Sequence, residues 1–214
     1  MQTKKRIILG SASPRRRELL EQIGISFEVR VSDKEEVYHS LIPEEIVKEL
    51  ALSKAENVAD DLREKQEQVK KISFDKKNNV LLDTIVIGAD TIVVSDGSIL
   101  GKPKDEADAV RMIRSLQGRS HKVYTGVAIL DYDDEGKRKS VVHAVETEVF
   151  VSPMSDEEIR EYAATGEPLD KAGAYGIQGR FAAYIERIDG DYYNVVGLPV
   201  SYVYRQLKEI AEKD

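Results

Sequence analysis

The sequence predicts an α/β protein of 214 residues in one domain, 1–214. A run of β-branched and small residues from Ile85 to Val94 is typical of a central strand covered on both faces. Two further apolar stretches, 122–132 and 139–151, flank Asp-Asp-Glu-Gly at 133–136 and predict a hairpin of two long strands. Apolar residues recur at helical spacing, with matching start or stop signals, in 14–23, 43–58, 105–116 and 200–210.

The composition excludes several classes of function. A net charge of −7 argues against broad binding to nucleic acids or acidic membranes, because both are polyanions. The chain has no cysteine, which rules out disulfides, zinc thiolate sites and thiol catalysis. No stretch approaches transmembrane length or forms a signal peptide, so we expect a cytoplasmic protein without a nucleic-acid or membrane partner.

Asp90 is the unusual residue of the central strand. A carboxylate among apolar neighbours needs hydrogen bonds or a cation, because the free energy needed to bury an unpaired charge far exceeds the stabilisation from one strand contact. Gly88 and Ala89 leave room for another backbone or a ligand to approach. Asp90 is either a strand residue satisfied by nearby amides or a metal ligand or general base.

The N-terminal segment predicts a phosphate cradle. Ile7 to Leu9 form a short strand, and Ser13 as N-cap with Pro14 as first residue begins a helix that stops at Gly24. The positive charges of Arg15 to Arg17 in the first turn are unfavourable beside the positive end of the helix dipole. A bound anion would make the same arrangement favourable. The alternative is a set of solvated arginines on an exposed helix.

Three further charged residues are candidates for the same site. Glu36 follows a strand predicted over 27–31 and belongs either to a solvated loop or to a divalent-cation site shared with Asp90. Lys54 lies inside the apolar stripe of the helix that Pro43 opens, where it either snorkels to solvent or ends in an anionic cleft. Lys102 follows a short return strand and either points back toward Asp90 or is an exposed turn lysine.

The segment from Asp60 to Asn79 is strongly charged, since eleven of its twenty residues ionise. Its apolar residues are too sparse for a broad buried face. We interpret it as a solvated helical extension or a mobile insertion without chemistry of its own.

A glycine-rich stretch, 166–179, holds four glycines in fourteen residues and predicts a loop that exposes its amides to a flat ligand. Gln178 offers donors and an acceptor suited to the edge of a base. A connecting loop without function is the alternative. Beyond it, 184–188 and 192–196 predict two strands joined by a tight turn at Asp189-Gly190.

Known nucleotide motifs are absent from the sequence. It has neither the glycine fingerprint of dinucleotide folds nor the phosphate loop of ATPases. His39, His121 and His143 are isolated from one another, so each is expected to be structural or exposed.

Five motifs follow one another along the chain. They are Ser-Ala-Ser-Pro-Arg-Arg at 11–16, Gly-Ala-Asp-Thr at 88–91, Gly-Lys-Pro at 101–103, Lys-Ala-Gly-Ala-Tyr-Gly-Ile-Gln-Gly at 171–179 and Val-Val-Gly-Leu-Pro at 195–199. Taken together and in this order, they resemble the Maf family of nucleotide pyrophosphatases, in register over nearly the whole chain. The resemblance implies an elongated mixed β-sheet with flanking helices and two lobes around a central cleft, like inosine triphosphate pyrophosphatases. It further implies cytoplasmic, often dimeric proteins that hydrolyse a nucleoside triphosphate with a divalent metal.

The resemblance also implies roles for individual residues. The 172–179 loop is similar to that of the branch acting on dTTP and UTP, and modified pyrimidine nucleotides are further candidate substrates. An acidic pair Glu35-Glu36 stands where Asp-Glu is frequent, so the metal ligand at this position stays open. The expected cofactor is Mg²⁺ or Mn²⁺, which oxygen ligands suit better than zinc. The implied site comprises Asp90 as catalytic carboxylate, Glu36 and Asp90 as metal ligands, Arg15, Thr91 and Gln178 as specificity residues, and Ser13, Arg15, Arg16, Lys54 and Lys102 around the phosphates.

Two non-enzymatic functions stay open at this point. The chain is alternatively a regulatory protein that senses nucleotides without turnover, or a partner protein in cell-division control. Either function tolerates loss of the Asp90 carboxylate better than an enzyme does.

Overall fold

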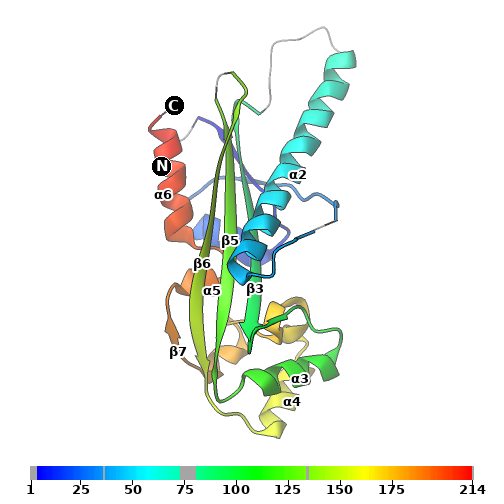
Figure 1. Ribbon diagram of the computed structural model, residues 1–214, viewed down its shortest axis with the longest axis vertical. Coiled ribbons are helices and arrows are strands. Elements are labelled where there is room, and N and C mark those ends of the chain that lie inside the picture. The colour runs from blue at the N-terminus through cyan, green and yellow to red at the C-terminus, as the bar shows by residue number, and fades with distance from the viewer. Residues whose placement is uncertain (1–3, 36, 73–80, 134, 214) are drawn as a thin grey trace.

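The computed structural model describes residues 4–35, 37–72, 81–133 and 135–213, which form an elongated molecule around one mixed β-sheet (Figure 1). The strand order is β2-β1-β3-β5-β6-β7, with β4 paired to β3. The pairs β1–β2 and β1–β3 are parallel, and the others are antiparallel. The predicted α/β class and mixed sheet are confirmed. The strands are β1 (Arg6–Leu9), β2 (Glu28–Val29), β3 (Thr84–Ser95), β4 (Ser98–Leu100), β5 (Ser120–Tyr132), β6 (Arg138–Val151) and β7 (Ile185–Asp189).

Helices flank this sheet. The long helix α2 runs along one side of the β3–β5–β6 region, with α5 and α6 across the sheet from it (Figure 1). Helices α3 and α4 lie together at one end of the molecule (Figure 1). Short 3-10 turns fill much of 167–184. The helices are α1 (Pro14–Gln22), α2 (Pro43–Ile72), α3 (Glu106–Leu116), α4 (Asp156–Ala164), α5 (Tyr192–Val196) and α6 (Val200–Ala211), and the 3-10 turns are η1 (Glu167–Asp170), η2 (Ala172–Ala174) and η3 (Arg180–Tyr184).

Strand β3 is the centre of the sheet, as the sequence predicts. It pairs with β1 on one edge and β5 on the other. All its residues are buried except Asp90 and Thr91, which are half-buried. Asp90 and Thr91 therefore mark the place where the buried strand reaches a cavity.

Two glycines let α2 lie directly on the sheet. A Cβ atom at Gly88 would lie 2.2 Å from the carbonyl oxygen of Ala51, and one at Gly126 would lie 2.0 Å from that of Val47. Gly126 is the β5 partner of Asp90. The close approach of a backbone expected at Gly88 is thus confirmed, and it brings the middle of α2 alongside Asp90.

Several predicted local signals are confirmed. The β5–β6 hairpin has thirteen matched pairs between Ser120 and Tyr132 on one strand and their partners on the other. Ser155 and Glu158 form a capping box at the start of α4, and Asp105 caps the predicted helix α3. Within the described part of the chain, no helix combines the length and apolar character needed to span a membrane.

The segment 192–196 is a helix, α5, so the prediction of a second strand there is wrong. Asp191 accepts a hydrogen bond from the Tyr193 amide and caps the helix. Asn194 then points into the core, where its Nδ2 donates to the Val123 carbonyl at 3.1 Å and to Thr147 Oγ1 at 2.8 Å. These tertiary bonds override the strand propensity of the tyrosines and valines.

Two other boundaries differ from expectation. The second strand is limited to 28–29 rather than 27–31, because Val29 and Val31 at this sheet edge are 40% and 53% exposed and bury little surface. The charged segment after Asp60 continues α2 as far as Ile72, which confirms the helical extension over that part. Residues 73–80 lie outside the described residues.

Candidate active site

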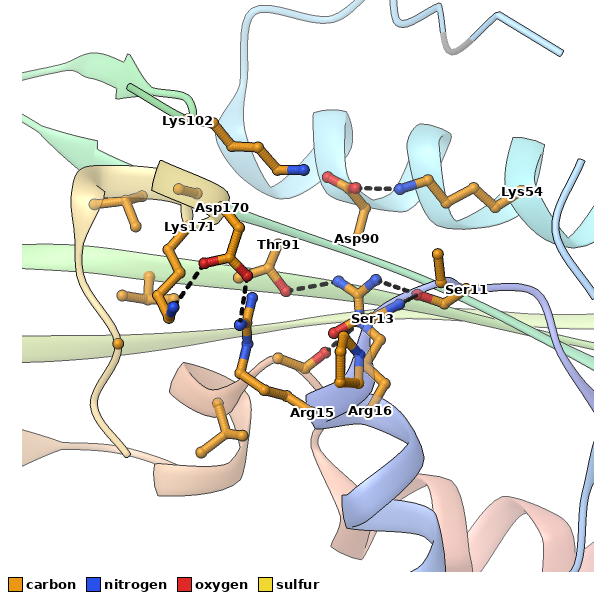
Figure 2. Close-up of a pocket in the computed structure, with 18 of the residues that line it drawn as sticks. Ser11, Ser13, Arg15, Arg16, Lys54, Asp90, Thr91, Lys102, Asp170 and Lys171 are labelled. Carbon is orange, nitrogen blue, oxygen red and sulfur yellow. Dashed lines mark hydrogen bonds and ion pairs between the residues drawn. The ribbon is translucent and has the colours of Figure 1, made fainter. Parts of the chain in front are cut away.

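One cavity of about 470 Å³ brings together segments that are far apart in sequence. It lies between the start of α1, the middle of α2, the polar residues Asp90 and Thr91 of β3 and the 170–178 loop (Figure 2). Glu36, the remaining predicted site residue, lies outside the described residues. The predicted site residues that line the cavity are Ser13, Arg15, Arg16, Lys54, Asp90, Thr91, Lys102 and Gln178.

Asp90 is paired with Lys54 inside this cavity. Lys54 Nζ lies 2.6 Å from Asp90 Oδ1, and the two side chains are 18% and 15% exposed. Lys54 therefore ends at an anion rather than in open solvent. The pair satisfies the half-buried carboxylate without burying it fully, and Asp90 Oδ2 has no donor among the described residues.

Lys102 approaches Asp90 from the other side. It follows β4, which returns antiparallel to β3, and Figure 2 shows its ammonium pointing toward the Asp90 carboxylate. Lys102 has no hydrogen bond or ion pair with any residue that the structure describes. Two lysines from different elements thus flank one carboxylate, and this geometry suits a substrate with several negative charges.

The start of α1 leaves its first amides available. Ser13 occupies the N-cap position with Pro14 after it, as predicted, but its hydroxyl makes no capping hydrogen bond. The first turn contains no acidic residue to satisfy the helix dipole. The helix start, which lines the cavity, can therefore accept an anion at Ser13.

The Arg16 side chain is held in place by hydrogen bonds to other residues of the protein. Its guanidinium donates to the Gly197 carbonyl at 2.8 Å, to Ser11 Oγ at 2.8 Å and to Thr91 Oγ1 at 3.1 Å, and the residue is 8% exposed. These bonds tie α1 to β3 and to the segment after α5. Phosphate binding by Arg16 stays a prediction, while its internal bonds give it a structural role at the cavity wall.

Thr91 belongs to a polar chain that continues into the sheet. Its hydroxyl lies 2.9 Å from Thr125 Oγ1, which donates to the Asn194 carbonyl at 2.9 Å. Sequence reasoning missed Ser11, Thr125 and Asn194 as residues that hold the site. Only their long-range contacts distinguish them, because threonine in a strand and serine before a helix are common.

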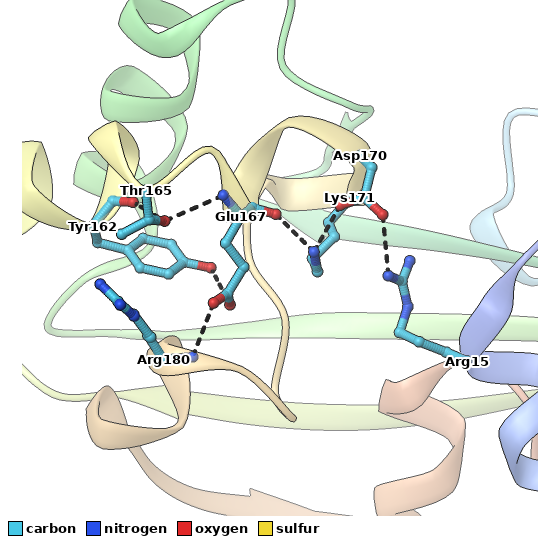
Figure 3. Close-up of polar contacts among 7 residues, drawn as sticks. All are labelled: Arg15, Tyr162, Thr165, Glu167, Asp170, Lys171 and Arg180. Atoms are coloured by element: carbon cyan, nitrogen blue, oxygen red, sulfur yellow. Dashed lines mark hydrogen bonds and ion pairs between the residues drawn. The ribbon is translucent and has the colours of Figure 1, made fainter.

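Arg15 forms an ion pair across the cavity with Asp170, with Nη1 and Oδ2 3.2 Å apart (Figure 3). Lys171 Nζ bonds the other oxygen of Asp170 at 2.6 Å. Partial burial acts to raise the pKa of Asp170, but Lys171 and Arg15 hold it below its ordinary value. Sequence reasoning assigned Asp170 and Lys171 no role, although a charged pair inside a glycine-rich loop facing arginines was an available signal.

The 172–178 segment is anchored by buried contacts. Gly173 adopts a φ of +70° and donates to the Gly101 carbonyl at 3.0 Å. Tyr175 is buried, and its hydroxyl lies 2.7 Å from His121 Nε2 on β5. Gln178 is exposed, lines the cavity and has no hydrogen-bond partner among the described residues, so its amide is available to a ligand.

His121 is buried and structural, as expected, and it makes folding stability depend on pH. Burial lowers its pKa from 6.5 to about 4. Because the folded pKa is depressed, the unfolded chain binds the proton more tightly, so stability is full above pH 6.5 and falls as pH drops toward 4. We expect urea unfolding to show a loss of at most about 1.4 kcal/mol per pH unit from this group.

The variant His121→Gln isolates that contribution from carboxylates that titrate in the same range. We expect its stability to fall less steeply than that of the wild type between pH 6.5 and 4. His39→Gln is the matched control, because the His39 side chain is 85% exposed. Parallel pH profiles for the wild type and His121→Gln contradict the prediction.

The donor set fits a magnesium or manganese ion held jointly with a phosphate ligand. The carboxylates lining the cavity within the described residues are Asp90 and Asp170, and no group of three or more metal-ligating side chains occurs among those residues. Mg²⁺ is commonly held by one or two carboxylates and substrate phosphates rather than by a full protein cage. Among the described residues, the Asp90 carboxylate is the candidate protein ligand in the cavity.

Comparisons with known proteins place the chain in a family. The chain is 47% identical over 204 residues to the dTTP/UTP pyrophosphatase of Agathobacter rectalis, covering 95% of this chain and 97% of that protein. It is 48% identical over 208 residues to the dTTP/UTP pyrophosphatase of Bacillus cereus, covering 96% and 90%. The solved Staphylococcus aureus Ham1 protein is a distant match, with 16% identity over 68% of this chain and 72% of that one and a TM-score of 0.36. The family model for Maf-like proteins matches residues 6–210, and the chain therefore belongs to the Maf family.

Proposed function

We propose that this protein hydrolyses dTTP and UTP to the nucleoside monophosphate and pyrophosphate. The observation that carries the proposal is the Asp90 carboxylate set between Lys54 and Lys102 in a cavity that Arg15 also lines. Relatives that match almost the whole chain bear the name dTTP/UTP pyrophosphatase. Modified pyrimidine nucleotides are candidate substrates of the same site.

The cations place the triphosphate. Lys54, Lys102 and Arg15 offset the charge of the phosphates, and the open start of α1 at Ser13 adds backbone donors. Arg15 exchanges its ion pair with Asp170 for the ligand, since that pair is exposed enough to be readily broken. Arg16 fixes the position of the helix start relative to Thr91 through its hydrogen bonds to Ser11 and Thr91.

Asp90 acts as the general base. Lys54 fixes the carboxylate through Oδ1, so Oδ2 accepts a proton from a water molecule that attacks the α-phosphorus. The bond from the α-phosphorus to the bridging oxygen breaks, and the electron pair leaves with pyrophosphate. Lys102 and Lys54 stabilise the charge that develops on this leaving group.

Asp90 and, by its family position, Glu36 would hold the divalent cation together with the substrate. When bound, Mg²⁺ or Mn²⁺ supplies further charge neutralisation at the phosphates.

A pyrophosphate-release assay over a nucleotide panel tests the function. We expect turnover of dTTP and UTP with Mg²⁺, weaker turnover of dCTP, ATP and GTP, and none with excess chelator. Binding of nucleotides without release of pyrophosphate contradicts the proposal and favours a nucleotide sensor.

Gln178 is proposed to read the base. We expect Gln178→Ala to lower the preference for dTTP over dCTP by about tenfold, because the amide that distinguishes the pyrimidine edges is removed. The dependence of turnover on Mg²⁺ concentration should stay unchanged. Gln206→Ala on α6 is the matched control, and an unchanged preference in Gln178→Ala contradicts the role.

A further inference from the structure

The main chain around Gln178 packs on two charged side chains of the preceding turn. A Cβ atom at Gly179 would lie 2.0 Å from Glu167 Oε1, and one at Gly176 would lie 2.7 Å from Lys171 Cε. Gln178 lies between these two glycines. The glycines thus serve close packing on Glu167 and Lys171, in addition to the loop flexibility that their number suggests.

The Glu167 carboxylate joins two parts of the fold (Figure 3). Its Oε1 accepts from the Tyr162 hydroxyl of α4 at 3.0 Å, and its Oε2 accepts from the Arg180 amide at 3.0 Å. Tyr162 is 4% exposed, and burial followed by the nearby Glu167 charge raises the pKa of its hydroxyl, which therefore stays a donor. One carboxylate thus connects a buried helix residue to the backbone two positions after Gln178.

Lys171 closes the other side of this arrangement. Its Nζ donates to the Glu167 carbonyl at 2.6 Å and to Asp170 Oδ1 at 2.6 Å (Figure 3). Its aliphatic stem lies against Gly176. The segment 176–180 is therefore contacted at both ends by side chains of the 167–171 turn, Lys171 at Gly176 and Glu167 at Arg180.

We propose that Glu167 is a positioning residue that sets base selectivity by holding Gln178 at the cavity. Glu167 does not line the cavity, so it acts through the main chain rather than by touching the nucleotide. This inference rests on the proposed function, in which Gln178 reads the base.

The test compares Glu167→Ala with Glu167→Gln. We expect Glu167→Ala to lower the ratio of kcat/KM for dTTP to that for dCTP by about tenfold or more, since displacement of a positioning group by roughly an ångström costs up to about a hundredfold. We expect Glu167→Gln to stay within about twofold of wild type. Its amide oxygen still accepts from the Arg180 amide, and its NH₂ group can donate to the Tyr162 oxygen.

Gly179→Ala provides an independent perturbation if Glu167→Ala folds poorly. Gly179 has a φ of −96°, which alanine adopts, so the clash with Glu167 is its main effect. We expect Gly179→Ala to lower the same ratio. Adding it to Glu167→Ala should lower the ratio little further, because the shortened side chain removes the clash.

Thermal unfolding of each variant separates a positioning role from a structural one. A lower Tm with an unchanged dTTP to dCTP ratio in Glu167→Ala and Gly179→Ala overturns the inference. If the wild type releases pyrophosphate while both variants keep its dTTP to dCTP ratio, the inference fails and the proposed function stands. If the wild type releases no pyrophosphate, the proposed function fails and the inference fails with it.

Discussion

The variant Asp90→Asn is expected to lower turnover of dTTP by about a thousandfold or more. Asparagine keeps the volume and can still accept a hydrogen bond from Lys54, but it cannot take a proton from water. General-base catalysis contributes about a hundredfold to ten-thousandfold to rate, and loss of the proposed metal ligand would add to the effect. Pyrophosphate release under saturating dTTP and Mg²⁺ measures the loss.

The control is Asp96→Asn at the turn between β3 and β4. Asp96 has a φ of +49°, which asparagine tolerates, and its side chain is 77% exposed. We expect this variant to retain wild-type turnover and both proteins to unfold at similar temperatures. Near-normal activity in Asp90→Asn removes Asp90 from the mechanism.

The second large effect is expected from Gly126→Ala. The three atoms nearest to its added Cβ all belong to the backbone of α2, namely the oxygen and carbon of Val47 at 2.0 and 2.3 Å and the nitrogen of Lys48 at 2.9 Å. A backbone cannot rotate away as a side chain does, so the helix must move off the sheet. We expect a loss of about 3 kcal/mol or more in the free energy of unfolding, measured with urea.

Gly101→Ala is the matched control for this variant, because a Cβ there meets nothing within 4 Å. We expect the control to unfold like the wild type. Any folded Gly126→Ala should also turn over dTTP more slowly, since α2 carries Lys54. Equal stability of the two variants contradicts the close packing of α2 on β5.

Residues that break a local pattern were predictable from the sequence. Asp90 is conspicuous as an acid within an apolar strand, and Lys54 as a lysine inside an apolar helical stripe. Both lie in the cavity. A carboxylate within an apolar strand requires a partner, so Asp90 is identified without knowledge of the fold. For Lys54 the sequence left two alternatives, solvent or an anionic cleft, and the ion pair with Asp90 decides for the second.

Features that depend on distant partners were not predictable in this way. The fixed guanidinium of Arg16 depends on Thr91 and Gly197, which lie 75 and 181 positions away. The α5 segment has strand-forming residues, and only the burial of Asn194 reveals the helix. The mixed sheet came from the family resemblance, since propensity does not distinguish parallel from antiparallel pairing. Metal use, homodimerisation and cytoplasmic residence stay predictions.

The bond between Arg16 and Gly197 has a consequence for biosynthesis. Proteins emerge from the ribosome N-terminus first, so the start of α1 exists long before its C-terminal partner does. Arg16 cannot take its final orientation until the segment around Gly197 has been synthesised and has docked on the sheet. A growing polypeptide therefore carries the helix that lines the cavity before the wall opposite it exists, and the pocket is finished only once residues 195–199 have left the ribosome.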